Sequence, residues 1–226
     1  MKEQGIPYQL IRSKRKSVAI IVTEQGTVEV RVPMKISQKQ IQLFVNQHRD
    51  WICQTVEKRK MAFQKKQQFT CQEGDTLPVL GREYPVKIGE QVCFTGQIFQ
   101  IPKGNFLAVR PQIIQEYRRI AKQFIPKRVD EISAQIGLYP SAVKINSAKG
   151  RWGSCSGKHS LNFSWRLIWA SPETVDYVII HELCHIRHHN HSQDFWSLVA
   201  SFLPNYRELR ENLKQISRRF QEENWD

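Results

Sequence analysis

A cluster of histidines in the last quarter of the chain constrains its fold most. The 226 residues include seven histidines, and five of them lie between positions 181 and 191. The first two frame the run His181-Glu182-Leu183-Cys184-His185, which follows a mostly apolar stretch over 175–180. Ser171-Pro172-Glu173 combines an N-cap residue, a proline for the first helical position and an acid for the first turn. This pattern predicts a buried helix from 172 to about 189.

The helical spacing of this run points to a metal site. His181 and His185 lie one turn apart, so both imidazoles leave the same face of the helix. Each can place a nitrogen about 2.0–2.1 Å from one zinc ion. Glu182 projects about 100° away, which suits contact with a metal-bound water rather than ligation. Because buried polar groups without partners are costly, we expect a zinc ion here and Glu182 as the general base of a hydrolase.

A catalytic zinc takes a third protein ligand and leaves its fourth position open. His191 follows Asn190, a residue type that tolerates the left-handed conformation in which many helices end. A chain that turns at Asn190 brings His191 back over the first two histidines, so we expect His191 as the third ligand. The alternatives are His188, His189, Glu208 and Glu211.

Residue type alone indicates possible contacts to the substrate or to a developing oxyanion. These candidates are Arg151, Trp152, His159 and Tyr206. Cys155 is an alternative nucleophile, but a metal site already accounts for hydrolysis. Cys184 is expected to be a small packed residue. The five cysteines are odd in number and form no C-x-x-C pair, so we expect free thiols.

The two halves of the chain differ in pattern. Alternating valines and isoleucines over 18–22 and 28–32 predict a hairpin. A helix over about 38–62, packed onto the hairpin through Trp51, a loop over 64–76 and short strands to 109 should follow. The second half predicts a helix from Pro111 to Gly137 that is kinked or broken at Pro126, strands over 143–146 and 160–168, and helices after Ser192 and Pro204. The expected class is α+β, with a β-rich region over 1–110 that holds one long helix and a helical domain with a small sheet over 111–226.

Composition narrows the class of protein. With 40% hydrophobic residues the chain can form a core, and no apolar run approaches 18 residues, so we expect no membrane span. Residues 1–9 lack the pattern of a secretory signal, which favours the cytoplasm. The formal net charge is +13, with basic runs over 12–16 and 58–60. The basic N-terminal half is therefore either a solvated surface or a site for nucleic acid.

Several motifs together resemble the YgjP-like metallopeptidases, which are related to the SprT-like proteins. The most specific are the H-E-L-C-H run, Asn190-His191-Ser192 with Phe195-Trp196, the R-W-G-S-C run over 151–155 and the L-N-F-S-W-R-L run over 161–167. Looser similarity at Arg31-Val32-Pro33, Trp51-Ile52 and Phe69 to Gly81 extends the resemblance over nearly the whole chain.

The resemblance implies a compact zincin-like domain in which a small sheet packs on the H-E-x-x-H helix. It implies zinc ligands at His181, His185 and His191, Glu182 as the base, and a peptide or protein substrate. It also implies that the strand over 160–167 lies beside the cleft, where an extended peptide can add to it.

Other functions fit parts of the sequence. His191 has the metzincin spacing from His185, but His188 replaces the required glycine, and Met1, Met34 and Met61 leave no methionine after the motif for a Met-turn. A nucleoside triphosphate pyrophosphatase is an alternative, although no Gly-rich phosphate loop is present. A nucleic-acid-associated protease or basic binding protein, and a structural zinc site with four protein ligands, are further alternatives.

Overall fold

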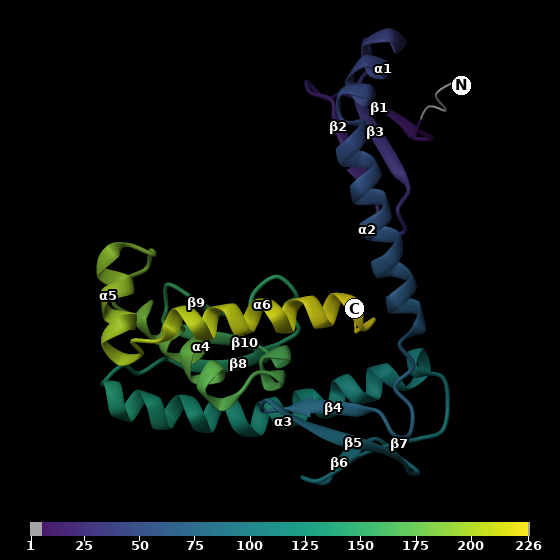
Figure 1. The fold of residues 1–226 in the computed structure, drawn as a ribbon. Helices are drawn as coiled ribbons and strands as arrows, with labels where there is room; N and C mark the ends of the chain where they lie inside the picture. The colour runs from purple at the N-terminus through teal and green to yellow at the C-terminus, as the bar shows by residue number, and fades with distance from the viewer. Residues whose placement is uncertain (1–5, 226) are drawn as a thin grey trace. The chain divides into compact units, whose positions relative to one another are not determined.

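The computed structural model describes residues 6–225, which form six α-helices and three small sheets (Figure 1). This mixture of helices and separate sheets confirms the expected α+β class. The chain divides into two compact units: the residues up to Phe69 with Gln221–Asn224, and Thr70–Phe220 with Trp225. The units divide near residue 70, whereas the division expected after residue 110 falls inside a helix.

The first unit is built on a three-stranded sheet. Strands β2 (Ala19–Val22) and β3 (Val28–Pro33) form the predicted antiparallel hairpin. Strand β1 (Gln9–Ser13) pairs in parallel with β3, so the strand order is β1-β3-β2. The alternation along β3 leaves Val28, Val30 and Val32 buried, and these valines form the sheet side of the core.

Two helices cover this sheet where the sequence predicted one. Helix α1 (Gln38–Gln47) begins at the capping box of Ser37 and Gln40, and α2 (Arg49–Gln68) follows after a break at His48. Because α2 continues to Gln68, the loop expected from residue 64 starts later. The expected packing of Trp51 is also wrong: its side chain is 49% exposed, and the neighbouring Ile52 is buried in the core instead.

The second unit begins with a four-stranded sheet of order β4-β5-β7-β6. Its strands are β4 (Thr76–Val79), β5 (Arg82–Ile88), β6 (Cys93–Phe94) and β7 (Phe99–Ile101).

The turn between β4 and β5 consists of two residues in the left-handed region. Leu80 has φ 49° and Gly81 has φ 74°, as a tight hairpin turn requires. The Leu80 N–H donates to the Ile168 carbonyl over 2.6 Å. A Cβ on Gly81 would lie 2.9 Å from the Cα of Ser171, so the turn packs closely against the residue that starts the histidine-bearing helix.

The long helix α3 (Phe106–Ile136) starts earlier than predicted. Asn105 caps it by accepting a hydrogen bond from the Leu107 N–H over 2.8 Å, so Pro111 lies inside the helix rather than at its first position. The helix also continues through Pro126, where a kink or break was expected, and ends as predicted at Gly137, with φ 70°. Tyr117 on α3 joins an aromatic core with Trp165, Trp169, Phe220 and Trp225.

A second three-stranded sheet lies beside the histidine-bearing helix. Strand β10 (Ser160–Ser164) is central, parallel to β8 (Ala142–Asn146) and antiparallel to β9 (Gly153–Cys155). Both edges of β10 are therefore paired, so an extended peptide cannot add to it as expected. The predicted strand to 168 is also too long, because residues 165–169 form a 3₁₀ helix. All five of these side chains are buried, whereas a strand with one buried face buries only every second side chain.

Three helices complete the second unit. Helix α4 (Pro172–Cys184) contacts β9 and α5 (Gln193–Phe202), and α6 (Tyr206–Glu222) is the last helix. The predicted starts at Pro172 and after Ser192 and Pro204 are confirmed. However, α4 stops at Cys184 rather than near 189. Over residues 6–225, no helix has both the length and the apolar character needed to cross a membrane.

Candidate metal centre and active site

The end of α4 presents the H-E-x-x-H residues to one region of the second unit. Ser171 caps the start of α4 by accepting a hydrogen bond from the Thr174 N–H over 3.3 Å. At the other end, His185 is the C-cap, and the Ile186 N–H donates to the Leu183 carbonyl over 3.0 Å. The chain therefore turns directly after the motif, five residues earlier than the turn expected at Asn190.

The segment after this turn is ordered by short polar contacts. The Asn190 side-chain carbonyl accepts from the Ser192 N–H over 3.3 Å, and the Ser192 hydroxyl accepts from the Phe195 N–H over 3.4 Å to cap α5. His191 lies between these two polar residues. Its position is thus fixed by the turn on one side and by the start of α5 on the other.

Three histidine side chains converge at this point. The Nε2 atoms of His181 and His191 are 3.1 Å apart, and one ligand nitrogen from each of His181, His185 and His191 lies within 4.8 Å of the others. Two ligands about 2.05 Å from a tetrahedral zinc ion lie about 3.3 Å apart, so the spacing fits a shared cation. Among the described residues, this cluster does not include the alternative ligands His188, His189, Glu208 and Glu211.

The protonation of His181 and His185 also suits metal binding. Burial, then the neighbouring His185 and His191, lower the pKa of His181 to about 3, and burial lowers the pKa of His185. Both rings are therefore neutral near pH 7, as metal ligation requires. The Nδ1 of His185 donates to the His188 carbonyl over 2.9 Å, because a carbonyl only accepts, and this leaves Nε2 of His185 unprotonated.

Among the described residues, the ring nitrogens of His181 meet one polar partner, the ring of His191. Within residues 6–225, its buried Nδ1 has no hydrogen-bond partner, and its Nε2 faces only the Nε2 of His191. Three imidazole rings that converge on one point, with no carboxylate among them, fit a divalent cation as the missing partner.

Aromatic side chains of α5 hold the histidine rings. Phe195 is fully buried and packs against all three, with ring centroids 4.9 Å from His181, 4.5 Å from His185 and 4.9 Å from His191. Trp196 stacks on His191, with ring centroids 5.6 Å apart. The Phe195-Trp196 pair of the sequence motif thus orients the rings.

Glu182 lies beside the cluster on the neighbouring face of α4. Its side chain is buried, with 5% exposure of the residue, and burial raises its pKa to about 7. The charge of Arg151 and a hydrogen bond from the Cys155 backbone N–H oppose this shift. A carboxylate with a pKa near neutrality is suited to accept and return a proton.

Gly153 on β9 allows this approach of Glu182. A Cβ at Gly153 would lie 2.6 Å from both Cγ and Oε1 of the glutamate. Only a glycine therefore leaves room for the carboxylate in its present position.

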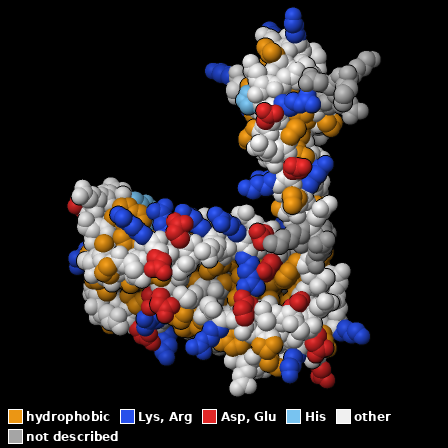
Figure 2. All heavy atoms as spheres, viewed as in Figure 1, with side chains coloured by type: hydrophobic (Ala, Val, Ile, Leu, Met, Phe, Trp, Pro, Cys, Tyr) orange, Lys and Arg blue, Asp and Glu red, His pale blue; other side chains and the backbone are white. Residues whose placement is uncertain are grey.

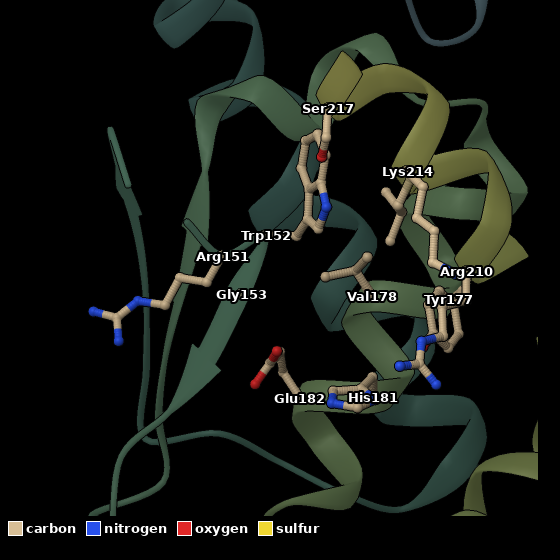
Figure 3. Close-up of a pocket in the computed structure, with 11 residues that line it drawn as sticks. Arg151, Trp152, Gly153, Tyr177, Val178, His181, Glu182, Arg210, Lys214 and Ser217 are labelled. Atoms are coloured by element: carbon tan, nitrogen blue, oxygen red, sulfur yellow. The ribbon is translucent and has the colours of Figure 1, made fainter. Parts of the chain in front are cut away.

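A cavity of about 320 Å³ opens beside Glu182 and His181 (Figure 3). Its lining comes from the segment 151–153, from α4 and from α6. The lining residues are Arg151, Trp152, Gly153, Tyr177, Val178, His181, Glu182, Arg210, Leu213, Lys214 and Ser217.

Of the four contact residues predicted from the sequence, two line the cavity and two do not. Arg151 and Trp152 line the cavity. Tyr206 lies outside the lining and stacks on Trp196, with ring centroids 5.2 Å apart. His159 also lies outside it, and its ring stacks on that of His189 at 6.3 Å.

The two cysteines near the site are poor nucleophiles. Burial, followed by the charge of Glu182, raises the pKa of the Cys155 thiol. Burial raises the pKa of Cys184 to about 12, and this side chain is fully buried, as expected for a packed residue. Neither environment favours the reactive thiolate.

Sequence reasoning missed Tyr177, Gly153 and Arg210. Tyr177 lies four residues before His181, so helical spacing alone could have indicated it. Gly153 and Arg210 come from β9 and α6, and only the tertiary fold brings them to α4.

Comparison with known proteins identifies a family over most of the chain. The YgjP-like family, described as a metallopeptidase domain, matches residues 16–216. A search of curated proteins gave no match.

A search of solved structures gave weak matches to two metallopeptidase zymogens. Jannalysin of Methanocaldococcus jannaschii has a TM-score of 0.36 and 23% identity, over 40% of this chain and 94% of its own. Abylysin of Pyrococcus abyssi has a TM-score of 0.38 and 22% identity, over 44% of this chain and 98% of its own. The family match spans the histidine cluster and all of the cavity lining except Ser217. The chain therefore belongs to the YgjP-like metallopeptidase family, which implies a bound metal ion.

Proposed function

We propose that the protein is a zinc-dependent peptidase in which His181, His185 and His191 hold the zinc and Glu182 is the general base. The convergence of three imidazoles beside a buried carboxylate and an open cavity carries this proposal. A bound zinc ion would polarise the scissile carbonyl and lower the pKa of a water molecule. Nitrogen ligands of this kind suit zinc among the common divalent metals.

The chain's own residues supply the proton transfers. Glu182 accepts a proton from the attacking water and delivers it to the leaving nitrogen, because its pKa of about 7 allows both protonation states near neutrality. The Cys155 N–H and the Arg151 charge favour the ionised carboxylate. Burial raises the pKa of Tyr177, so its phenol stays protonated and is a candidate donor to the developing oxyanion.

The sheet beside α4 favours a peptide over a nucleotide as substrate. Strand β9 is at the edge of its sheet, and β10 is its one partner among the described strands. Its residues 153–155 reach Glu182 through Gly153 and the Cys155 N–H. We therefore propose that an extended peptide pairs with the free edge of β9 through main-chain hydrogen bonds, and not with β10 as the sequence suggested.

The test combines metal content with peptide cleavage. The wild-type protein, Glu182→Gln and the control Glu173→Gln are compared, since Glu173 lies on the exposed first turn of the same helix. We expect about one zinc ion per chain in all three by mass spectrometry of metals, and loss of cleavage by about 10²–10⁴-fold in Glu182→Gln alone. Bound zinc without cleavage of any peptide in a diverse library would refute the proposal.

Binding of nucleic acid and a cytoplasmic location remain predictions. Figure 2 shows Lys and Arg side chains spread over both units with Asp and Glu among them, not gathered into one patch on this face. This distribution does not favour a nucleic-acid site there.

A further inference from the structure

One wall of the cavity beside Glu182 carries positive charge from α6. Arg210, Lys214 and Ser217 line this wall, and their spacing of four and three residues places them on one face of the helix. Arg151 adds a third cation at the opposite side. In Figure 3 its guanidinium is directed away from Glu182, whereas the Arg210 guanidinium lies near His181 and Tyr177.

Arg210 is the cation that is available to a ligand. Of the residues that the structure describes, none forms an ion pair with it, and its guanidinium lies 5.8 Å from the ring centroid of Trp196. Lys214, in contrast, already pairs with Glu211 over 2.6 Å. The one acid in the lining is Glu182, which the proposed mechanism uses as the base.

The remaining walls fit the stem of a side chain. Val178, Leu213 and Trp152 provide apolar surface in the lining. Pockets for drug-sized ligands have volumes of about 300–1,000 Å³. A cavity of about 320 Å³ is at the lower end of this range and suits one side chain better than a nucleoside triphosphate.

We infer that this cavity is a subsite for an acidic side chain of the peptide substrate and that Arg210 is its specificity-determining residue. This inference rests on the proposed peptidase function. A glutamate or aspartate next to the scissile bond would place its methylene groups on the apolar walls and its carboxylate on the guanidinium. The Arg210 wall would disfavour a lysine at the same position through like-charge repulsion.

The test uses zinc-loaded full-length protein and matched peptides. Each set carries Glu, Gln or Lys at one position, and the position is scanned over both sides of the scissile bond. We expect kcat/KM to favour Glu over Gln by about 10- to 100-fold at one position, the range of a charge-assisted hydrogen bond. Arg210→Gln should bring this ratio close to one, and Arg210→Glu should reverse the preference toward Lys.

Arg218→Gln is the matched control, because Arg218 is an exposed arginine of the same helix that does not line the cavity. It should keep the wild-type ratio. Binding of glutarate, measured by calorimetry, supplies a readout without catalysis and should weaken about tenfold or more in Arg210→Gln and not in Arg218→Gln.

The outcomes separate the subsite from the peptidase function. Cleavage with equal kcat/KM for Glu, Gln and Lys peptides, or a Glu preference that survives Arg210→Gln, would overturn the subsite and leave the peptidase standing. No cleavage of any peptide would overturn the peptidase, and with it this subsite. Release of pyrophosphate from nucleoside triphosphates without peptide cleavage would overturn both, since Arg210 would then contact phosphate.

Discussion

Gly153 and Glu182 are in such close contact that no side chain fits between them. A Cβ on Gly153 would lie 2.6 Å from the Cγ and from Oε1 of the glutamate, and 2.9 Å from its Cδ. Real Cβ atoms do not approach other atoms this closely, so the glycine and the carboxylate depend on each other. The position of the proposed base is therefore set by the strand as well as by its own helix.

Gly153→Ala should inactivate the protein without removing its metal. The added methyl group displaces the Glu182 carboxylate from the site of proton transfer, and a displacement of about 1 Å can lower the rate by about 100-fold. We expect kcat for peptide cleavage to fall by about this factor while zinc content stays at the wild-type level. Gly157→Ala is the control, because a Cβ there meets no atom within 4 Å. Equal activity of the two variants would show that the contact does not position the base.

His191→Ala should remove a metal ligand and so lower zinc affinity strongly. The loss should exceed the about 10- to 100-fold that is typical when a residue that only orients a ligand is removed. The structure brings His191 to His181 and His185, whereas the exposed His189 contacts His159. His189→Ala should therefore leave the affinity unchanged. Competition with a chromophoric chelator measures both variants. Loss of zinc from His189→Ala instead of His191→Ala would show that the third ligand is assigned wrongly.

Gly81→Ala should destabilise the second unit more than Gly96→Ala does. Both glycines have positive φ, 74° and 92°, so an alanine at either position is strained by about 1–2 kcal/mol. Only at Gly81 does the new Cβ also meet backbone, 2.9 Å from the Cα of Ser171, which adds about 1–3 kcal/mol. The free energy of unfolding in urea measures the difference. Equal losses would mean that the turn does not support the start of α4.

Glu116→Gln should lower stability at neutral pH and have less effect in acid. Glu116 on α3 accepts from the Arg119 guanidinium over 2.7 Å and from the Phe94 N–H over 2.8 Å, and the bond from Arg119 is the main reason that its pKa is lowered. A lowered pKa in the folded state means that the stabilisation is complete above the ordinary pKa of about 4.5 and is lost as pH falls through the folded value.

The expected difference in the free energy of unfolding is about 1 kcal/mol above pH 5, because Arg119 is half exposed. It should shrink steadily on acidification toward pH 3, as measured by urea unfolding at each pH. Glu90→Gln, at an exposed position, is the control. A difference that stays constant with pH would contradict the role of the ion pair.

Local signals in the sequence predicted several helix boundaries and the approach of three histidines to one another. Ser37, Ser171 and Ser192 cap helices as expected, and Gly137 ends one. The relation of His181, Glu182 and His185 follows from the period of a single helix. These features depend on residues close in sequence, so their physical causes are visible without a structure.

The features that the sequence did not predict depend on distant contacts. The parallel pairing of β1 with β3 joins residues 20 positions apart, as between Gln9 and Glu29. Residues 165–169 leave the strand conformation as all five side chains become buried, with Trp165 and Trp169 in the aromatic core. Arg210 likewise reaches the cavity only because α6 packs beside α4. No local propensity encodes these arrangements.

The early end of α4 makes the metal centre a local structure. Its three histidines lie within eleven consecutive residues, 181–191, so bringing them together closes only short loops and costs little chain entropy. The ion would then stabilise one short segment of the chain and would not cross-link distant parts of it. On withdrawal of the ion, faster amide exchange should be confined to this segment and the start of α5, while the buried strand β10 keeps its protection.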